Sequence, residues 1–576
     1  MMIKRRTLPA DLPVLPGFSP ILQRIFAARG ILSDTQLDKS LQALLPFNTL
    51  MDIDKAVIRL EQALLSQQRI LVIGDFDADG ATSSALAVSA LRTMGALHVE
   101  FLVPNRFEFG YGLTPGIIEV AKKWQPNLII TVDNGIASLE GVDAANEAGI
   151  DVLVTDHHLP GDSMPKAVAI VNPNQRDDQF LSKSIAGVGV IFYVMLALRR
   201  HLSTTGWFTS KNIPEPNMSQ FLDLVTLGTV ADVVALDQNN RILINQGLMR
   251  IRQGLCRPGI LALIEVAGRT YTHLRESDLG FVVAPRLNAA GRLDDMSLGI
   301  ECLLSDNLEK ARSLANELDA LNIERRRIET EMKAQALQAL DKLSLQNTPL
   351  PMALCLFDKS WHQGVIGILA GRLKERYHRP VIAFAAVSDS EIKGSARSVA
   401  SLNIRDVLAA IDKDNPGLIT KFGGHAMAAG LSLHPDAFIP FKAALLAEVS
   451  QHLDLSQCEG ERLSDGPLLA HELNLALACT LQEAGPWGQQ FPEPTFDNVF
   501  EILEQRLVGQ HHLKLTLQHD AGGGPIDAIA FNIDAKIWPN HRASYLHAIY
   551  QLDINEYNGR TKLQLVIMEM QAMLLD

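Results

Sequence analysis

The segment LVIGDFDADG (71–80) places three aspartates, Asp75, Asp77 and Asp79, at alternate positions directly after a run of apolar residues. Carboxylates at this spacing repel one another, and burying each of them costs free energy unless a positive partner is present. We therefore expect positive charge beside these three side chains.

Similar side chains follow later apolar runs. Asp133 ends the run IITVDNG, and Asp156, His157 and His158 end the run VLVTDHH, while Asp232 lies within the otherwise apolar segment TLGTVADVVAL (226–236). Aspartate and histidine without a cysteine thiolate suit Mn²⁺ or Mg²⁺ better than structural zinc. Several carboxylates shared by two such cations are a known device for attack on phosphorus.

The elements expected to position these residues alternate regularly along the chain. Short apolar, β-branched runs are separated by helix-like segments, which predicts a parallel sheet with helices on both faces. The strand-like runs are 69–75, 98–104, 127–135, 151–158 and 167–173, and the helix-like segments are 83–95, 116–124 and 139–149. The carboxyl ends of parallel strands form a ligand crevice, so the aspartates and histidines should converge there.

Each of these features has a simpler explanation when it is taken alone. A single aspartate at a strand end commonly caps the next helix, and a His-His pair is commonly a hydrogen-bonded or surface feature. Four such features in register along one sheet are not explained in that way. The sequence therefore predicts a metal site.

The rest of the chain indicates further domains. Residues 305–343 contain no Gly or Pro and space apolar residues at helical intervals among many charges, which predicts one long linking helix. A second α/β pattern begins near residue 350, and strand-like segments after the Pro- and Gly-rich stretch 485–496 predict a small β-barrel. The expected divisions are 1–50, an N-terminal segment; 51–304, the domain with the metal site; 305–345, the linking helix; 346–455, the second α/β domain; and 456–576, the barrel domain.

Composition narrows the class of protein. A chain of 576 residues with 47% hydrophobic and 20% charged residues is expected to form several globular domains. Its five cysteines are scattered, which argues against disulfides and a structural zinc site and favours a reducing cytoplasm. The first residues lack the apolar core of a signal peptide, and the longest apolar stretch, 185–198, is too short for a membrane span. The net charge of −13 is only a weak objection to a nucleic-acid partner, because local patches and bound cations decide binding.

Four short segments, DFDADG, VDNG, TDHH and ADVVAL, resemble the signature motifs of the DHH phosphoesterase family. The segment GGHAMAAG (423–430) resembles the glycine-rich motif of the DHHA1 domain. With RLNAAGRL (286–293), HQGVIGILAGRL (362–373) and GSARS (394–398), the chain is similar over nearly its whole length to the family's single-strand-specific 5′→3′ DNA exonucleases. The resemblance implies an α/β fold in which a parallel-sheet DHH domain is joined by a long helix to a smaller α/β DHHA1 domain, followed by an OB-like barrel.

The resemblance also implies a role for each matching residue in hydrolysis by two divalent cations, Mn²⁺ or Mg²⁺. One cation would be bound by Asp77, with Asp75 beside it, and the other by Asp79, His157 and Asp232, with Asp133 bridging both. His158 would contact the scissile phosphate, and Asp156 would orient the two histidines.

A further set of residues is implied to bind DNA. The 5′-terminal phosphate would be held by Arg106, Ser395 and Arg397. The backbone of the DNA strand would be held by Arg286, Asn288 and Arg292. A phosphate near the cut would be held by Gly423, Gly424 and His425. The cleft between the DHH and DHHA1 domains is expected to admit one strand but not a duplex, and an OB-like barrel would track single strands.

These implications favour an exonuclease that acts on single-stranded DNA in repair and recombination, with a single-strand-binding protein and a helicase as expected partners and no membrane association. Two alternatives stay open. A small-substrate phosphodiesterase or pyrophosphatase of the same family would not need the long helix, the barrel or a 5′-phosphate pocket. A non-catalytic replication scaffold would not need the intact ligand set from Asp77 to Asp232.

Overall fold

The computed structural model describes residues 2–105, 108–110, 112–344, 350–454, 460–509, 511–534, 537–557 and 559–573. The chain divides into two compact units. One unit contains residues 320–462 with the first two residues of the chain, and the other contains residues 3–319 and 463–576.

The larger unit contains a five-stranded sheet with the strand order β3-β2-β4-β5-β6. All its neighbouring strands run parallel, as the sequence predicts. The strands are β2 (Ile70–Gly74), β3 (Val99–Leu102), β4 (Leu128–Val132), β5 (Asp151–Thr155) and β6 (Ala169–Val171). Every residue of β2 and β4 is buried, which explains why these strands appear in the sequence as continuous apolar runs.

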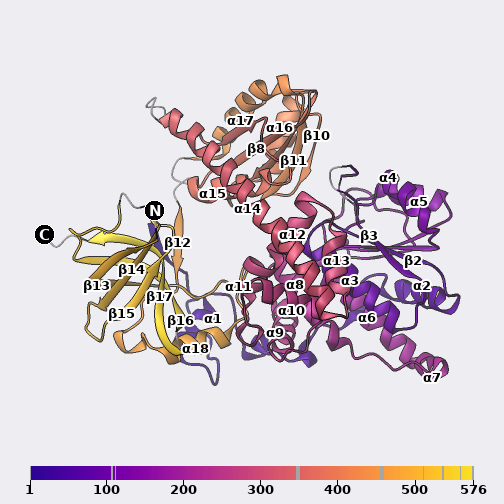
Figure 1. Ribbon diagram of the computed structural model, residues 1–576, viewed down its shortest axis with the longest axis horizontal. Helices are drawn as coiled ribbons and strands as arrows, with labels where there is room; N and C mark the ends of the chain where they lie inside the picture. Colours follow the sequence, from indigo (N-terminus) through magenta and orange to yellow (C-terminus); the bar gives the residue numbers. More distant parts are fainter. Residues whose placement is uncertain are drawn as a thin grey trace. The chain divides into compact units, whose positions relative to one another are not determined.

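Helices cover both faces of this sheet, which confirms the predicted layers (Figure 1). On one face, Ile117 and Val142 from two helices pack against Leu71 and Ile129 of the sheet. The helices of that face are α4 (Pro115–Ala121) and α5 (Leu139–Glu147), and those of the other face are α2 (Ile53–Leu65), α3 (Ala78–Thr93) and α6 (Gly187–Thr204). The apolar stretch 185–198 therefore lies almost entirely in the largely buried helix α6 of this domain.

A helical region follows the sheet. Its helices are α7 (Trp207–Lys211), α8 (Leu222–Ala231), α9 (Gln238–Arg252), α10 (Pro258–Val266), α11 (Glu276–Asp278), α12 (Ala284–Leu293) and α13 (Ser297–Leu304). A π-helical turn, Leu279–Val283, directly precedes α12. Pro285 in the first turn of α12 has no amide hydrogen to donate to the preceding turn, which accounts for the irregular winding.

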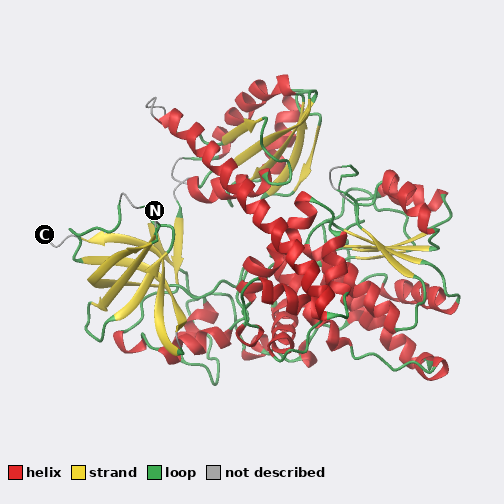
Figure 2. Cartoon of the chain, in the orientation of Figure 1, coloured by secondary structure: helices red, strands yellow, loops and turns green. Residues whose placement is uncertain are grey.

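The C-terminal strands form a closed five-stranded barrel with the order β13-β14-β15-β17-β16, confirming the expected OB-like architecture (Figure 2). Only the β15–β17 pair is parallel among the described barrel pairings. The strands are β13 (Phe496–Val508), β14 (His512–His519), β15 (Ile526–Ala530), β16 (Tyr545–Tyr557) and β17 (Arg560–Met573). They are preceded by β12 (Glu461–Ser464) and α18 (Leu475–Ala484).

The N-terminal segment packs against the stretch that leads into the barrel. It contains β1 (Met2–Arg5) and α1 (Pro20–Ala27). Phe26 of α1 stacks on the rings of Trp487 and Phe491, and Arg29 pairs with the buried Asp465. Residues more than 400 positions apart in the sequence therefore share one core.

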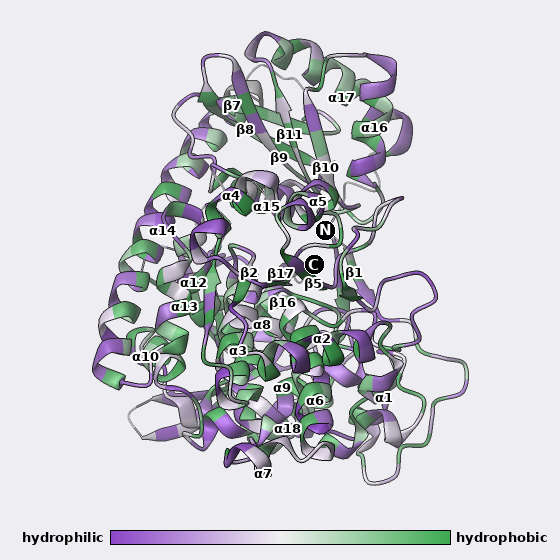
Figure 3. Cartoon of the chain, turned by 90° about the vertical axis from the view of Figure 1, so that its right-hand side faces the viewer, coloured by the Kyte–Doolittle hydropathy of each residue, from purple (hydrophilic) through white to green (hydrophobic). Residues whose placement is uncertain are grey.

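One unbroken helix of 37 residues, α14 (Leu308–Ser344), matches the predicted linking helix. Figure 3 shows it as a mainly hydrophilic ribbon with short hydrophobic bands, in agreement with the narrow apolar stripe in the sequence. The boundary between the two units falls inside this helix, at residues 319 and 320.

The smaller unit contains a mixed sheet with the order β10-β11-β9-β8-β7, in which only β7 and β8 are parallel. Its elements are β7 (Leu354–Asp358), α15 (Ile366–Tyr377), β8 (Val381–Ser388), β9 (Glu391–Arg397), α16 (Ile404–Asp414), β10 (Lys421–Gly424), β11 (Ala428–Leu433) and α17 (Phe438–His452). Phe384 and Leu431 of the sheet pack with Leu408 and Phe441 of the two later helices. Within the described part of the chain, no helix is long and apolar enough to span a bilayer.

Candidate metal centre and phosphate contacts

The loop after β2 carries the three alternating aspartates into the start of α3. Asp77 is the N-cap residue of that helix, and its Oδ1 accepts hydrogen bonds from the amides of Asp79 (2.9 Å) and Gly80 (3.1 Å). The capping role that strand-end aspartates commonly play is therefore real here. Both capping bonds go to the same oxygen of Asp77, and Asp75 and Asp79 are buried beside it.

Asp79 is fixed by the N-terminus of α6. Its Oδ2 accepts from the amide of Gly187 at 2.7 Å and its Oδ1 from that of Val188 at 2.9 Å. A helix N-terminus favours negative charge, so this arrangement stabilises the ionised carboxylate. A Cβ on Gly187 would lie 2.8 Å from Oδ1 of Asp133, so glycine is needed for the helix to approach both aspartates.

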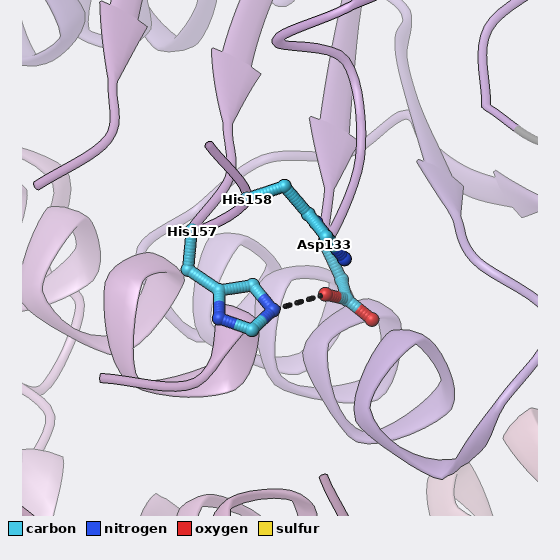
Figure 4. Close-up of side chains that lie close together, drawn as sticks. All are labelled: Asp133, His157 and His158. Atoms are coloured by element: carbon cyan, nitrogen blue, oxygen red, sulfur yellow. Dashed lines mark ion pairs between the residues drawn. The ribbon is translucent and has the colours of Figure 1, made fainter. Parts of the chain in front are cut away.

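Asp133 lies at the end of β4 and His157 at the end of β5, as Figure 4 shows. His157 Nε2 is 3.1 Å from Oδ1 of Asp133 and 3.5 Å from Oδ2 of Asp232, which directly follows α8. Asp133 is buried and adopts a left-handed backbone conformation, with φ of 62°. Strained backbone of this kind is common at functional sites.

The buried Asp156 organises the two histidines. Its Oδ1 accepts from the backbone amides of His157 and His158 and lies 2.7 Å from Nδ1 of the His158 ring, while its Oδ2 accepts from the amide of Ile136. Burial favours the neutral imidazole of His158, but the hydrogen bond to Asp156 and its charge raise the pKa of His158 to about 9. Burial also opposes ionisation of Asp156, yet its bond to His158 keeps the pKa of Asp156 below the ordinary value.

Three overlapping groups of side chains could each hold a metal ion. Within each group, the ligand atoms lie within 4.8 Å of one another. The groups are Asp75, Asp77 and Asp133; Asp79, His157 and Asp232; and Asp133, His157 and His158. The structure thus brings together the seven residues to which the sequence assigned metal binding or the scissile phosphate. Asp133 and His157 are shared between groups, as expected for adjacent positions of two cations.

The electrostatics of this cluster fit divalent cations. Burial, and then the charge of Asp77, raise the pKa of Asp79 to about 7. Burial and the neighbouring carboxylates raise the pKa values of Asp133 and Asp232 well above the ordinary value. A cation among them would relieve this mutual repulsion, and carboxylates with one imidazole are a donor set suited to Mn²⁺ or Mg²⁺.

The three residues of α12 that the sequence assigned to the DNA backbone have different surroundings. Arg286 is buried, and its Nη2 pairs with Oδ1 of Asp319 on α14 at 2.9 Å. Oδ1 of Asn288 accepts a hydrogen bond from the amide of Ala78 at 2.8 Å. Arg292 is half-buried in the last turn of the helix. Nothing in the sequence near Arg286 signals its partner, because Asp319 lies on another helix.

In the smaller unit, Ser395 and Arg397 lie on β9. Arg397 Nη1 donates to Oγ of Ser395 at 3.1 Å and to the carbonyl of Ala396 at 2.8 Å. A Cβ on Gly367, in the first turn of α15, would lie 3.0 Å from Arg397 Nη2 and from Ser395 Oγ. Burial lowers the pKa of Arg397, and among the described residues no carboxylate forms an ion pair with it. Arg106, the third residue assigned to the 5′ phosphate, lies outside the described residues.

The glycine-rich segment forms the β10–β11 hairpin beside these residues. Gly423, Gly424 and His425 are exposed at its end, and the amide of His425 donates to the carbonyl of Ala428. Gly423 pairs in register with Gly430, which in turn pairs with Ser395. A Cβ on Gly423 would meet no atom within 4 Å, so this part of the sheet is an open surface next to Ser395.

The barrel presents a small surface of basic and aromatic side chains. Arg506 and Lys514 are register partners on β13 and β14. The ring of His512 lies edge-on to that of Phe531 at 5.3 Å, and Phe531 is 53% exposed. Phe531 was missed because a single aromatic residue at the end of a strand-like run carries no pattern of its own.

Comparisons with known proteins show the family to which the chain is similar. Models of three families match: the DHH family N-terminal domain at residues 69–229, the DHHA1 domain at 350–451 and the RecJ OB domain at 464–569. The chain is 53% identical to the single-stranded-DNA-specific exonuclease RecJ of Escherichia coli, over 97% of this chain and 96% of that protein. It is 33% identical to the protein of the same name from Thermus thermophilus, over 90% of this chain and 73% of that protein.

Solved structures of RecJ also match this chain. The crystal structure of RecJ in complex with Mn²⁺ from Thermus thermophilus matches with a TM-score of 0.80 and 29% identity, covering 100% of this chain and 80% of that chain. The structure of the same protein in complex with Mg²⁺ matches with a TM-score of 0.76 and 27% identity, covering 100% of this chain and 79% of that chain.

Proposed function

This chain belongs to the RecJ family of DHH phosphoesterases, and we propose that it is a metal-dependent exonuclease that degrades single-stranded DNA from the 5′ end and releases 5′-mononucleotides. The proposal rests on one observation. Asp133 belongs to one ligand group and His157 to a second, and a third group contains both residues, so the groups are adjacent. This cluster lies in a chain that is similar to RecJ over 97% of its length. Intact ligands argue against a non-catalytic scaffold, and the barrel argues against a small-substrate enzyme.

The ligand groups support a specific assignment of two cations, Mn²⁺ or Mg²⁺. We assign Asp77, with Asp75 beside it, to one cation, and Asp79, His157 and Asp232 to the other, with Asp133 shared. Cations held by these residues would supply charge neutralisation at the attacked phosphate and a more acidic water molecule as the nucleophile.

The protein's own groups hold this arrangement and bind the scissile phosphate. The amides of α6 fix the carboxylate of Asp79, and Asp156 fixes both histidines through their backbone amides. Because Asp156 occupies Nδ1 of His158, we assign Nε2 of that ring to the scissile phosphate. The ion pair of Asp156 with His158 fixes the orientation of this ring, so that Nε2 would be available as a donor to the substrate.

We assign the 5′-terminal phosphate to Ser395 and Arg397 on β9. A guanidinium beside a hydroxyl is well suited to a phosphate monoester. The absence of an ion-pairing carboxylate for Arg397 among the described residues supports this, since the guanidinium is then available to an external anion. The open hairpin with Gly423, Gly424 and His425 lies in the same sheet and would hold the next phosphates.

On the larger unit, we assign Arg292 to the backbone of the DNA strand. Arg286 already forms an ion pair with Asp319, so any contact of Arg286 with DNA would be made in addition to that pair. The barrel would bind single strands through phosphate contacts at Arg506 and Lys514 and base stacking at Phe531.

The expected setting follows from this activity. We propose that the enzyme acts in DNA repair and recombination, with a single-strand-binding protein and a helicase as partners, because a single-strand-specific enzyme depends on strands that have been separated and kept apart. The cytoplasm is the proposed compartment, which is supported by the free thiols of Cys256, Cys302, Cys355 and Cys479.

The test is the degradation of a long strand labelled at either end, in the presence of Mn²⁺. A 5′-phosphorylated single strand labelled at the 5′ end should release labelled mononucleotide from the first turnover, whereas a 3′ label should appear in small products only late. A blunt duplex of the same sequence should resist. Release from the 3′ end or internal cuts would refute the direction. An inert long strand with rapid hydrolysis of dinucleotides or pyrophosphate would favour the small-substrate alternative.

A further inference from the structure

Two asparagine side chains, Asn134 and Asn288, hold the aspartate loop 75–80 and the neighbouring strand end. We propose that both are positioning residues: they set the spacing between the carboxylates of this loop and Asp133, and so determine the affinity for divalent cations. The inference rests on the proposed metal site and adds two residues that do not themselves bind metal.

Asn288 acts on the start of α3. The first amides of a helix have no partner inside the helix and must be satisfied from outside. Oδ1 of Asp77 accepts from the amides of Asp79 and Gly80, and Oδ1 of Asn288 accepts from the amide of Ala78, the first residue of the helix, at 2.8 Å. The Ala78 amide belongs to the peptide group that follows Asp77. Asn288 therefore clamps the backbone between two proposed metal ligands.

A second contact comes from the same face of α12. Gly291 is one helical turn after Asn288, and a Cβ on it would lie 1.8 Å from the carbonyl oxygen of Phe76. The backbone of α12 thus rests directly on the loop residue between Asp75 and Asp77. The helix is itself anchored, because Arg286 pairs with Asp319. These contacts make α12 a rigid support for the aspartate loop.

Asn134 acts on the ends of two strands, whereas Asn288 acts on the start of a helix. It is 1% exposed, and its Nδ2 donates to the carbonyls of Ile73 at 3.1 Å and Val132 at 2.9 Å. These carbonyls stand at the ends of β2 and β4, two residues before Asp75 and directly before Asp133. One amide group therefore ties together the two strand ends that carry proposed ligands. Groups that orient metal ligands commonly change metal affinity by about 10- to 100-fold when they are removed.

Asn288 acts through its side-chain oxygen and Asn134 through its side-chain nitrogen, so substitution by aspartate should affect the two positions differently. Asn288 uses its oxygen as an acceptor, so Asn288→Asp keeps the interaction with Ala78, whereas Asn288→Ala removes it. Asn134 uses its nitrogen as a donor, so Asn134→Asp removes the interaction and places a carboxylate against two carbonyls. Asn134→Ala removes the same donor without adding charge.

The experiment measures Mn²⁺ binding to the full-length protein by electron paramagnetic resonance, with Tm, KM for a single strand and kcat at saturating Mn²⁺. We expect about 10- to 100-fold weaker Mn²⁺ binding for Asn288→Ala, Asn134→Ala and Asn134→Asp. Asn288→Asp should recover most of the loss seen in Asn288→Ala. The control is Asn474→Ala, which removes an asparagine that caps α18 by the same kind of bond and should leave Mn²⁺ binding unchanged.

Other outcomes overturn the inference. Wild-type Mn²⁺ affinity in Asn288→Ala with a raised KM would make Asn288 a contact to the strand. Equal losses in Asn288→Asp and Asn288→Ala would show that the acceptor is not the important atom. If Asn134→Asp does not fold, normal Mn²⁺ binding by a folded Asn134→Ala protein refutes the role of Asn134. A wild-type protein that binds Mn²⁺ but does not degrade DNA would refute the proposed function and leave this measurement valid.

Discussion

Replacement of Arg397 by alanine should weaken the preference of the enzyme for a 5′-phosphorylated strand over a 5′-hydroxyl strand. The guanidinium donates to Ser395 Oγ and the Ala396 carbonyl, and among the described residues no carboxylate neutralises it. Loss of one charge-assisted hydrogen bond to a phosphate costs about 1.5–3 kcal/mol. At about 1.4 kcal/mol for each factor of ten, the preference should fall by about one to two orders of magnitude.

The assay compares kcat/KM for two otherwise identical single strands, one with a 5′ phosphate and one with a 5′ hydroxyl. Arg397→Lys keeps the charge without the planar fork and should fall between wild type and Arg397→Ala. Arg405→Ala, which removes an exposed arginine of α16 in the same unit, is the control for general loss of positive charge and should keep the wild-type ratio. None of the three substitutions removes a proposed metal ligand, so cleavage should persist in all three variants. An unchanged ratio in Arg397→Ala would refute the assignment of the phosphate to this residue.

Three further predictions concern the metal centre and stability. Asp133→Ala should lower the rate of hydrolysis by more than about 100-fold, since this carboxylate belongs to two ligand groups. It should also abolish the rise in Tm that Mn²⁺ produces in the wild type. A rate above a tenth of wild type would contradict the two-cation assignment. Arg29→Ala should reduce the free energy of unfolding in urea by about 1.5–3 kcal/mol, because it removes two guanidinium hydrogen bonds from the buried Asp465 and leaves that carboxylate only the longer ion pair with Arg6 at 3.5 Å. Specific activity of the folded enzyme at 25 °C should stay normal, and a loss below about 1 kcal/mol would show that the Arg29–Asp465 pair is not a stabilising link. Burial opposes ionisation of Asp497, but the bonds from Arg5 and Ser464 keep its pKa below the ordinary value, so its contribution to stability is present near neutral pH and is lost as the pH falls through the folded-state pKa. Asp497→Asn should therefore lower Tm at pH 7 and flatten the decline of Tm in acid, and an equal decline in both proteins would contradict this.

Much of the metal centre could be predicted from the sequence because its ligands follow a local rule. Each ligand-bearing segment after β2, β4 and β5 directly follows an apolar run, and parallel strands bring such ends to one edge of a sheet. The capping bonds of Asp77 are equally local, since they join residues two and three positions apart. The division of the seven residues into overlapping groups needed the resemblance to a known family, because spacing alone does not say which oxygens lie within reach of one cation.

The sequence by itself determined the α/β class, the long helix, the barrel and the edge of the sheet at which the ligands meet, because periodic burial of apolar residues specifies each element locally. Tertiary structure alone decided which distant groups support them: the ion pair of Arg286 with Asp319, the acceptor that Asn288 offers to Ala78, and the alignment of Ser395 with the glycine hairpin. Those contacts join residues whose separation along the chain follows no period. They form only when the packing of whole helices and strands fixes their positions, and so no pattern in the sequence predicts them.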